Sequence, residues 1–92
     1  MSTVYLPAPL RPAVGGAKSV DLDGATVGEL VSALVARHPS LGEQLLTPDG
    51  DLNRFVNVFR NGEDVRYLDG LATSVAPDDE VRLLPAMAGG VR

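Results

Sequence analysis

Residues 26–39 read TVGELVSALVARHP, and this stretch has the clearest periodicity of the chain. Its apolar residues recur at the spacing of one helical face, namely Val27, Leu30, Val31, Leu34 and Val35. Thr26 and Glu29 have the spacing of a capping box, in which a hydroxyl and a carboxylate accept hydrogen bonds from free amides at a helix start. Pro39 cannot continue a helical hydrogen-bond ladder. The stretch therefore predicts one amphipathic helix that ends near His38.

Alternating apolar and polar residues on both sides of this helix predict strands. The predicted strands are residues 3–8, 18–22, 55–59, 65–68 and 80–84. Pro7 lies within the first of them, so we expect that strand to end early or to bulge. Asn61-Gly62 is the strongest short hairpin signal and joins the third strand to the fourth. Residues 41–46 are expected to form a short helical turn.

This order of elements predicts an α+β domain. We expect one mixed sheet of four to five strands, with the main helix on one face. The strand over residues 80–84 should lie centrally, because a parallel neighbour needs a crossover connection and the helix supplies one. The domain is expected to span residues 1–85. Residues 86–92 are expected to form a flexible C-terminal tail that carries Gly89-Gly90.

The composition argues against several functional classes. Hydrophobic residues make up 45% of the 92 residues, enough for a single packed core but for little catalytic machinery besides. The net charge of −4 argues against a nucleic-acid partner and favours docking on a basic enzyme surface. The chain has no cysteine and a single histidine, His38, so we expect no thiol catalysis, no metal site and no enzymatic activity.

The hydropathy of the chain suggests no membrane association. No apolar run approaches the ~20 residues that cross a bilayer. The N-terminus also lacks the basic and apolar segments of a secretory signal. We therefore expect a cytoplasmic protein that is a monomer when free.

The pair Gly89-Gly90 follows closely on the last predicted strand and Pro85. Glycine has no side chain, so its backbone can enter a narrow slot that any Cβ would block. A terminal glycine carboxylate could thus reach ATP in the active site of a partner. Adenylation and attack by a sulfur donor would then leave a thiocarboxylate. Alternatively, the pair is only a flexible end, since 10 glycines in 92 residues make such pairs common.

Several segments together carry a resemblance to a known family. They are Leu10-Arg11-Pro12, Gly15-Gly16, Arg54-Phe55-Val56-Asn57, Glu63-Asp64-Val65-Arg66, Leu71-Ala72-Thr73 and, above all, Leu84-Pro85-Ala86-Met87-Ala88-Gly89-Gly90. With these segments the chain resembles the MoaD/ThiS sulfur carriers, particularly the CysO type of cysteine biosynthesis, over nearly its whole length. The resemblance implies a ubiquitin-like β-grasp fold. It also implies that Gly90 becomes the thiocarboxylate and that residues Ala86, Met87, Ala88, Gly89 and Gly90 enter a partner active site.

The resemblance further implies a set of partner enzymes. An E1-like adenylating enzyme would use ATP, so the carrier itself would bind no cofactor. The sulfur acceptor would be a PLP-dependent cysteine synthase acting on an activated serine, and a processing metalloprotease would release the adduct. Related carriers supply molybdopterin, thiazole or thiosugar biosynthesis, so the acceptor stays open. A ubiquitin-like conjugation or interaction module, with Gly90 joined to lysines, is the alternative from another class.

The sequence departs from the family pattern after Gly90, where it continues with Val91 and Arg92. The long side chain of Arg92 should not fit a slot for glycine. We therefore expect a precursor that loses Val91-Arg92 and matures at Gly90. The other interpretation is that the dipeptide is a cloning remnant.

The open face of the predicted sheet offers a second candidate site. If Val56 and Val58 face the helix, Phe59 faces outward together with Leu84, and these two residues form an apolar docking patch. If Phe55 and Phe59 instead belong to the core, this patch does not exist. Alternation alone leaves both arrangements open.

Two polar features have structural interpretations. His38 is expected at the helix end, where a cation suits the helix dipole. Asp78, Asp79 and Glu80 could imitate a metal cluster, but beside Pro77 they are expected to form a solvated turn.

Overall fold

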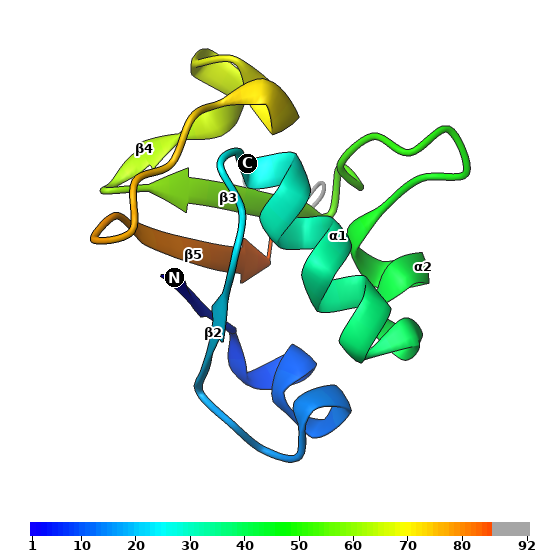
Figure 1. Ribbon diagram of the computed structural model, residues 1–92. Coiled ribbons are helices and arrows are strands. Elements are labelled where there is room, and N and C mark those ends of the chain that lie inside the picture. Colours follow the sequence, from blue (N-terminus) through cyan, green and yellow to red (C-terminus); the bar gives the residue numbers. More distant parts are fainter. Residues whose placement is uncertain (86–92) are drawn as a thin grey trace.

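The computed structural model describes residues 1–85, which form a five-stranded mixed sheet with a helix packed across one face (Figure 1). The strand order is β2-β1-β5-β3-β4. Strand β1 (Ser2–Tyr5) pairs antiparallel with β2 (Ser19–Leu22) and parallel with β5 (Glu80–Pro85). On its other side β5 pairs antiparallel with β3 (Val56–Arg60), which in turn pairs with β4 (Glu63–Asp64). The central position predicted for the last strand is confirmed.

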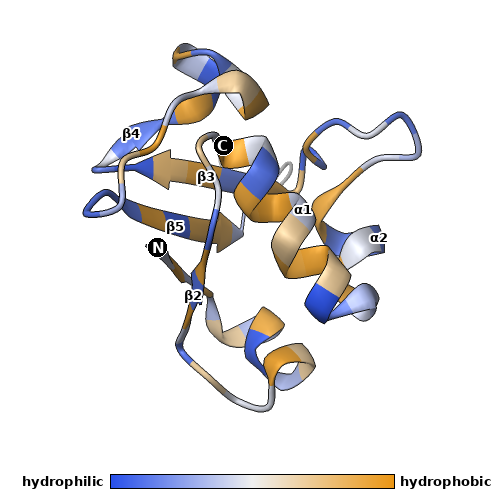
Figure 2. Cartoon of the chain, viewed as in Figure 1, coloured by the Kyte–Doolittle hydropathy of each residue, from blue (hydrophilic) through white to orange (hydrophobic). Residues whose placement is uncertain are grey.

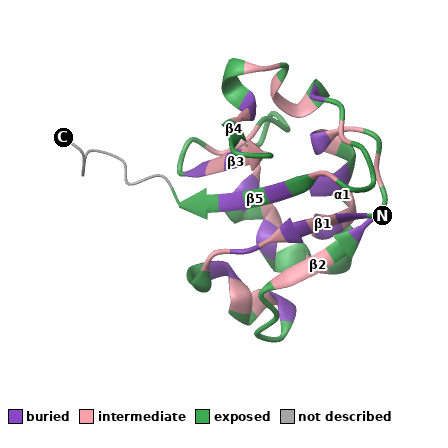
Figure 3. Ribbon diagram, turned by 90° about the vertical axis from the view of Figure 1, so that its left-hand side faces the viewer, coloured by how far each residue is buried: buried purple, intermediate pink, exposed green. Residues whose placement is uncertain are grey.

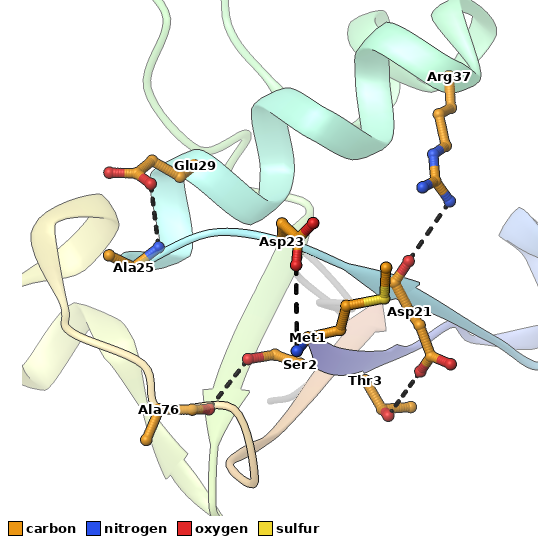
Figure 4. Close-up of polar contacts among 9 residues, drawn as sticks. All are labelled: Met1, Ser2, Thr3, Asp21, Asp23, Ala25, Glu29, Arg37 and Ala76. Atoms are coloured by element: carbon orange, nitrogen blue, oxygen red, sulfur yellow. Dashed lines mark hydrogen bonds and ion pairs between the residues drawn. The ribbon is translucent and has the colours of Figure 1, made fainter.

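Helix α1 (Val27–Arg37) is the predicted amphipathic helix. The Thr26 hydroxyl accepts a hydrogen bond from the Glu29 backbone N–H at 3.2 Å, as predicted. The Glu29 carboxylate reaches one residue beyond the cap and accepts from the Ala25 N–H at 3.0 Å (Figure 4). The helix ends before His38, whose backbone N–H donates to the Leu34 carbonyl at 2.9 Å. His38 is therefore a helix-end residue, as expected.

The core lies between α1 and the sheet. Buried and exposed residues alternate along β5 from Glu80 to Leu84 (Figure 3), and hydropathy alternates with them as far as Leu83 (Figure 2). The sheet and α1 contribute the buried residues Val4, Leu22, Val27, Leu30, Val31, Leu34, Val56, Val58, Val81 and Leu83. The connecting segments contribute Leu6, Leu10, Val14, Leu41, Leu45 and Val65. One hydrophobic core thus joins all the elements.

The first strand ends at Tyr5 and does not extend to residue 8. Proline lacks a backbone donor and has a fixed φ that suits a 3-10 helix, so the proline-rich segment after Tyr5 leaves the sheet. It forms the 3-10 helix η1 (Ala8–Val14), which buries Leu10 and Val14. Ala8, the last residue of the predicted strand, is exposed.

The strand predicted over residues 65–68 is wrong. Strand β4 contains only Glu63–Asp64, and Val65–Tyr67 forms the 3-10 helix η3. The Asp64 carboxylate accepts a hydrogen bond from the Arg66 backbone N–H at 2.9 Å. This local bond replaces a sheet bond and turns the chain, so that Val65 becomes fully buried.

Turns and short helices complete the domain. Asn61 and Gly62 have φ of 51° and 88°, the left-handed values that a tight hairpin turn of this kind requires. The segment predicted as a helical turn forms η2 (Pro39–Leu41) and α2 (Gly42–Leu45), and η4 (Gly70–Ala72) packs near α1. No helix within residues 1–85 is both long enough and apolar enough to cross a membrane.

Candidate functional site

The residues predicted to carry the chemistry follow directly on β5. Ala86, Met87, Ala88, Gly89, Gly90, Val91 and Arg92 all lie outside the described residues. The structure does define where this segment begins, because Pro85 is the last residue of the central strand. Strand β5 is hydrogen-bonded to β1 on one side and to β3 on the other. The point from which the segment departs is therefore held by the sheet.

Covalent geometry limits how far Gly90 can lie from the sheet. Gly90 is the fifth residue after Pro85, and an extended chain advances at most ~3.6 Å per residue. Gly90 therefore lies within about 18 Å of Pro85. Any enzyme that holds Gly90 in its active site must approach the end of the sheet at which β5 terminates.

The exposure of the strand residues decides which sheet face is open. Val56 and Val58 are 6% and 0% exposed, so they face α1 and Phe59 faces outward. Leu84 is 41% exposed, whereas the preceding Leu83 is buried at 1%. The arrangement with Phe55 and Phe59 in the core is therefore excluded.

Phe59 and Leu84 share the open face as diagonal neighbours. Phe59 lies opposite Arg82 in the β3–β5 register, and Leu84 lies opposite Asn57. Figure 3 shows this face of the molecule, with the strands in front of α1. Phe59 is half-buried, so Leu84 is the more accessible of the two. Both residues are available on one surface, and their use by a partner remains a prediction.

Tyr5 and Arg82 extend this surface toward β1. The Arg82 guanidinium lies 4.4 Å from the centroid of the Tyr5 ring, a cation–π contact. The Arg82 Nε also donates to the Glu80 carboxylate at 2.8 Å. Tyr5 was not among the predicted site residues, although the alternation over residues 3–8 places its side chain on the face opposite to that of the buried Val4. The open face thus combines aliphatic, aromatic and charged groups.

An apolar groove of about 320 Å³ lies at one side of the end of β5. Its lining residues are Pro7, Pro9, Leu10, Gln44, Asn53, Phe55, Val56 and Pro85. Phe55 is 49% exposed, and the Arg54 guanidinium lies 5.4 Å from its ring centroid. The segment after Pro85 therefore begins at the wall of this groove.

A second cleft of about 290 Å³ lies on the other side of Pro7. Its lining residues are Tyr5, Leu6, Pro7, Arg11, Lys18, Arg82, Leu83 and Leu84. We call this the basic cleft, because it contains the cations Arg11, Lys18 and Arg82. Sequence reasoning missed it, since these three residues come from distant segments that only the fold brings together.

The acidic run after Pro77 forms a turn, as expected. The Asp79 carboxylate accepts from the Ala76 backbone N–H at 2.8 Å and from the Asn61 side-chain amide at 2.9 Å. These two hydrogen bonds, and after them the Arg60 charge, lower the pKa of Asp79. Within residues 1–85, no group of three or more His, Cys, Asp or Glu residues is arranged to hold a metal ion.

Comparisons with known proteins link this domain to a family. Residues 4–90 match the model of the ThiS family. The chain is 49% identical over 90 residues to the sulfur carrier protein CysO of Mycobacterium tuberculosis, covering 96% of this chain and 97% of that protein. A chain in the crystal structure of the BexX/CysO complex of Amycolatopsis orientalis is similar with a TM-score of 0.88 at 42% identity, covering 98% and 100% of the two chains. The small archaeal modifier protein 1 of Haloferax volcanii is 41% identical over 80 residues, or 84% of this chain and 87% of that protein.

Proposed function

The chain belongs to the ThiS family and has the ubiquitin-like β-grasp fold, and from this premise we propose that it is a sulfur carrier whose Gly90 becomes a thiocarboxylate. The observation that carries the proposal is the match of residues 4–90, which includes the Gly89-Gly90 pair. A relative that is 49% identical over nearly the whole chain is a sulfur carrier protein. The match and the position of Pro85 at the end of β5 support the same site.

The proposed activation consists of two substitutions. An oxygen of the Gly90 carboxylate attacks the α-phosphorus of ATP, and pyrophosphate leaves, which gives an acyl-adenylate. Hydrosulfide then attacks the acyl carbon, the bond to the phosphate oxygen breaks, and AMP leaves. The product is a thiocarboxylate, and neither step changes an oxidation state. An E1-like adenylating enzyme supplies the catalytic groups and binds the ATP.

The carrier contributes backbone geometry to this chemistry and no catalytic side chain. Glycine at positions 89 and 90 lets the chain pass a narrow opening, where a Cβ would collide with the walls. The sheet fixes the start of this segment at Pro85. We therefore propose that the activating enzyme binds the folded domain while Gly90 occupies its active site.

We propose that the chain matures by losing Val91 and Arg92. The thiocarboxylate must form on a terminal carboxylate, and the family match stops at Gly90. An arginine at the end would bring a long side chain to an opening suited to glycine. A protease that removes these residues would then control the supply of active carrier.

The proposed acceptor reaction serves cysteine synthesis. In it, the β-carbon of an activated serine, held by a PLP-dependent cysteine synthase, forms a bond to the thiocarboxylate sulfur, and the activating group leaves with the serine Oγ. A metalloprotease then cuts the cysteine adduct from Gly90 and restores the carboxylate. The likeness to CysO favours this acceptor. The CysO of Amycolatopsis orientalis forms a complex with BexX, and we therefore keep thiosugar, thiazole or molybdopterin synthesis as alternative destinations of the sulfur.

A second candidate function is conjugation to proteins. It is favoured by the 41% identity to a small archaeal modifier protein. In that case a lysine amine would attack the acyl carbon of the adenylate or of the thiocarboxylate, AMP or hydrosulfide would leave, and Gly90 would end in an isopeptide bond. The two functions share adenylation and differ only in the final acceptor.

Carrier-dependent exchange between pyrophosphate and ATP tests the activation step. We would compare three chains: residues 1–90, residues 1–92, and residues 1–90 with Gly90→Ala. The adenylating enzyme would be purified from the source organism by this same exchange activity. We expect exchange with the 1–90 chain and only background exchange with the other two. Equal exchange with residues 1–92 would reject the maturation step, and no exchange with residues 1–90 would reject the proposed activation.

A further inference from the structure

We propose that the basic cleft beside β5 receives acidic side chains of the enzyme that adenylates Gly90. This inference rests on the proposed function, because it takes the partner from there. It concerns a surface of the described domain, and it specifies the charge that the partner must present. Sequence composition alone suggested the opposite, namely that this acidic chain docks on a basic surface.

Two segments that pack around Leu6 position the basic cleft. The Leu6 backbone N–H donates to the Lys18 carbonyl at 2.9 Å, which fixes the start of β2 beside the end of β1. The Arg11 Nε donates to the Leu6 carbonyl at 3.0 Å, which orients the guanidinium from η1. The Arg11 guanidinium and the Lys18 backbone are thus fixed near the end of β1, and both residues line the basic cleft together with Leu83 and Leu84 of β5.

Arg82 completes the basic cleft from β5 itself. Its guanidinium lies over the Tyr5 ring on the open face, 4.4 Å from the ring centroid. Leu84 lies two residues further along the same face and also lines the cleft. The basic cleft is therefore continuous with the exposed apolar side chain that was predicted to dock a partner.

The charges of the basic cleft are poorly compensated within the domain. Among residues 1–85, no carboxylate lies within 4.0 Å of a side-chain nitrogen of Arg11 or Lys18, and Arg82 pairs only with Glu80. The chain as a whole carries a net charge of −4, so the basic cleft has the opposite sign to the net charge of the chain. The position of the cations, and not the net charge, should decide which partner surface fits here.

Acidic residues gather at the other end of the sheet. Asp21 and Asp23 lie near the N-terminus, where Thr3 donates to Asp21 at 2.8 Å and the Met1 amino group lies 4.0 Å from Asp23 (Figure 4). Asp79 lies before the start of β5, the end opposite to Pro85. These carboxylates therefore lie at one end of β5, and the cations of the basic cleft lie at the other end, which leads to Gly90.

The reach of the chain brings the enzyme to this surface. Gly90 is the sixth residue after Leu84, which allows at most about 22 Å between them. An enzyme that holds Gly90 must therefore place its active site within about 22 Å of Leu84, which lines the basic cleft. Carboxylates on that enzyme would attract the basic cleft during the encounter and orient the carrier, whereas cations there would repel it.

Charge reversal at Lys18 tests the inference with a matched control. In the 1–90 chain, Lys18→Glu reverses a cation of the basic cleft, and Arg37→Glu makes the same change in net charge on α1. Arg37 donates to the Asp21 carbonyl at 3.3 Å and does not line the basic cleft. Circular dichroism and urea unfolding of both variants would verify the fold.

The readout is the KM and kcat for the carrier in pyrophosphate exchange with the purified adenylating enzyme. We expect Lys18→Glu to raise KM about tenfold at low ionic strength with little change in kcat, because rim charges act on the encounter. Lys18→Gln should give an intermediate KM. Added salt should reduce the difference, since exposed charges are screened. Arg37→Glu should change KM less than about twofold.

Three outcomes would overturn the inference. Equal KM values for Lys18→Glu and Arg37→Glu would mean that only net charge matters. An unchanged KM for Lys18→Glu would mean that the enzyme does not use the basic cleft, and a lowered KM would mean that it presents cations there. The absence of exchange with unmodified residues 1–90 is a distinct result, which would reject the proposed function together with this inference.

Discussion

Leu83 and Leu84 are adjacent residues of β5 that have different roles in the domain. Leu83 is 1% exposed and packs in the core under α1, whereas Leu84 is 41% exposed on the open face. The alternation of a strand produces this difference, because successive side chains point to opposite faces. One position therefore supports the fold, and the next is available to a partner.

Truncation of these two leucines should separate stability from binding. We expect Leu83→Ala to lower the free energy of unfolding by about 2–4 kcal/mol, since it leaves a cavity in the core. Leu84→Ala should change it by no more than about 0.5 kcal/mol, because the side chain is partly solvated. The same Leu84→Ala should raise the KM for the carrier in pyrophosphate exchange. Urea unfolding measures the first quantity, and a large loss of stability in Leu84→Ala would contradict this assignment of faces.

At the scale of single residues, the sequence predicted strands but did not predict which face of each strand is buried. The alternation in residues 55–59 predicted a strand but left open whether Val58 or Phe59 is buried. The helix covers the valines, and that fact depends on packing between elements distant in the sequence. Similarly, the Asp64 side chain bonds to the Arg66 N–H and ends β4, which the alternation after Asn61-Gly62 did not indicate.

At the scale of elements, strong local signals were enough. The capping pair Thr26 and Glu29 and the terminal Pro39 predicted α1 to within one residue, because each acts on the backbone next to it. Asn61-Gly62 predicted the β3–β4 turn for the same reason. The 3-10 helix η1 was missed, since its prolines indicated only where a strand must stop. Proline shows where a strand ends, but it does not show which structure follows the strand.

The turn before β5 leads to a prediction of pH dependence. The pKa of Asp79 is lowered by the Ala76 N–H, the Asn61 amide and the Arg60 charge, in that order. A carboxyl group whose pKa is lower in the folded state stabilises the fold above its unfolded pKa of about 3.9, and this contribution is lost as pH falls through the folded value. We therefore expect Asp79→Asn to be less stable than the unmodified chain near neutral pH.

The difference between the two chains should narrow at low pH. As pH falls below the unfolded pKa and then through the lower pKa of the folded state, the unmodified Asp79 also becomes protonated and loses its advantage. Urea unfolding at neutral pH and at low pH measures both differences. Asp78→Asn is the matched control, because no hydrogen bond or ion pair of the Asp78 side chain is seen in residues 1–85. A difference that stays constant across this range would show that the carboxylate charge plays no part.

At the scale of the whole molecule, the central strand joins the fold to the proposed chemistry. The core anchors β5 on three sides, through β1, β3 and α1, and β5 leads directly into residues 86–92. The sequence predicted this arrangement from the order of its elements. The basic cleft could not be predicted in this way, because Arg11, Lys18 and Arg82 lie up to 71 positions apart. Their proximity appears only when η1, β2 and β5 are assembled.

The central claim is that Gly90 is the terminal residue that carries sulfur. The most direct test is the intact mass of the protein isolated from its own cells under mild, non-reducing conditions. We expect a chain that ends at Gly90. In a fraction of the molecules one oxygen is replaced by sulfur, and Gly90→Ala should abolish that species. A protein that retains Val91 and Arg92 without any gain of sulfur, or that is found linked to lysines of other proteins, would contradict it.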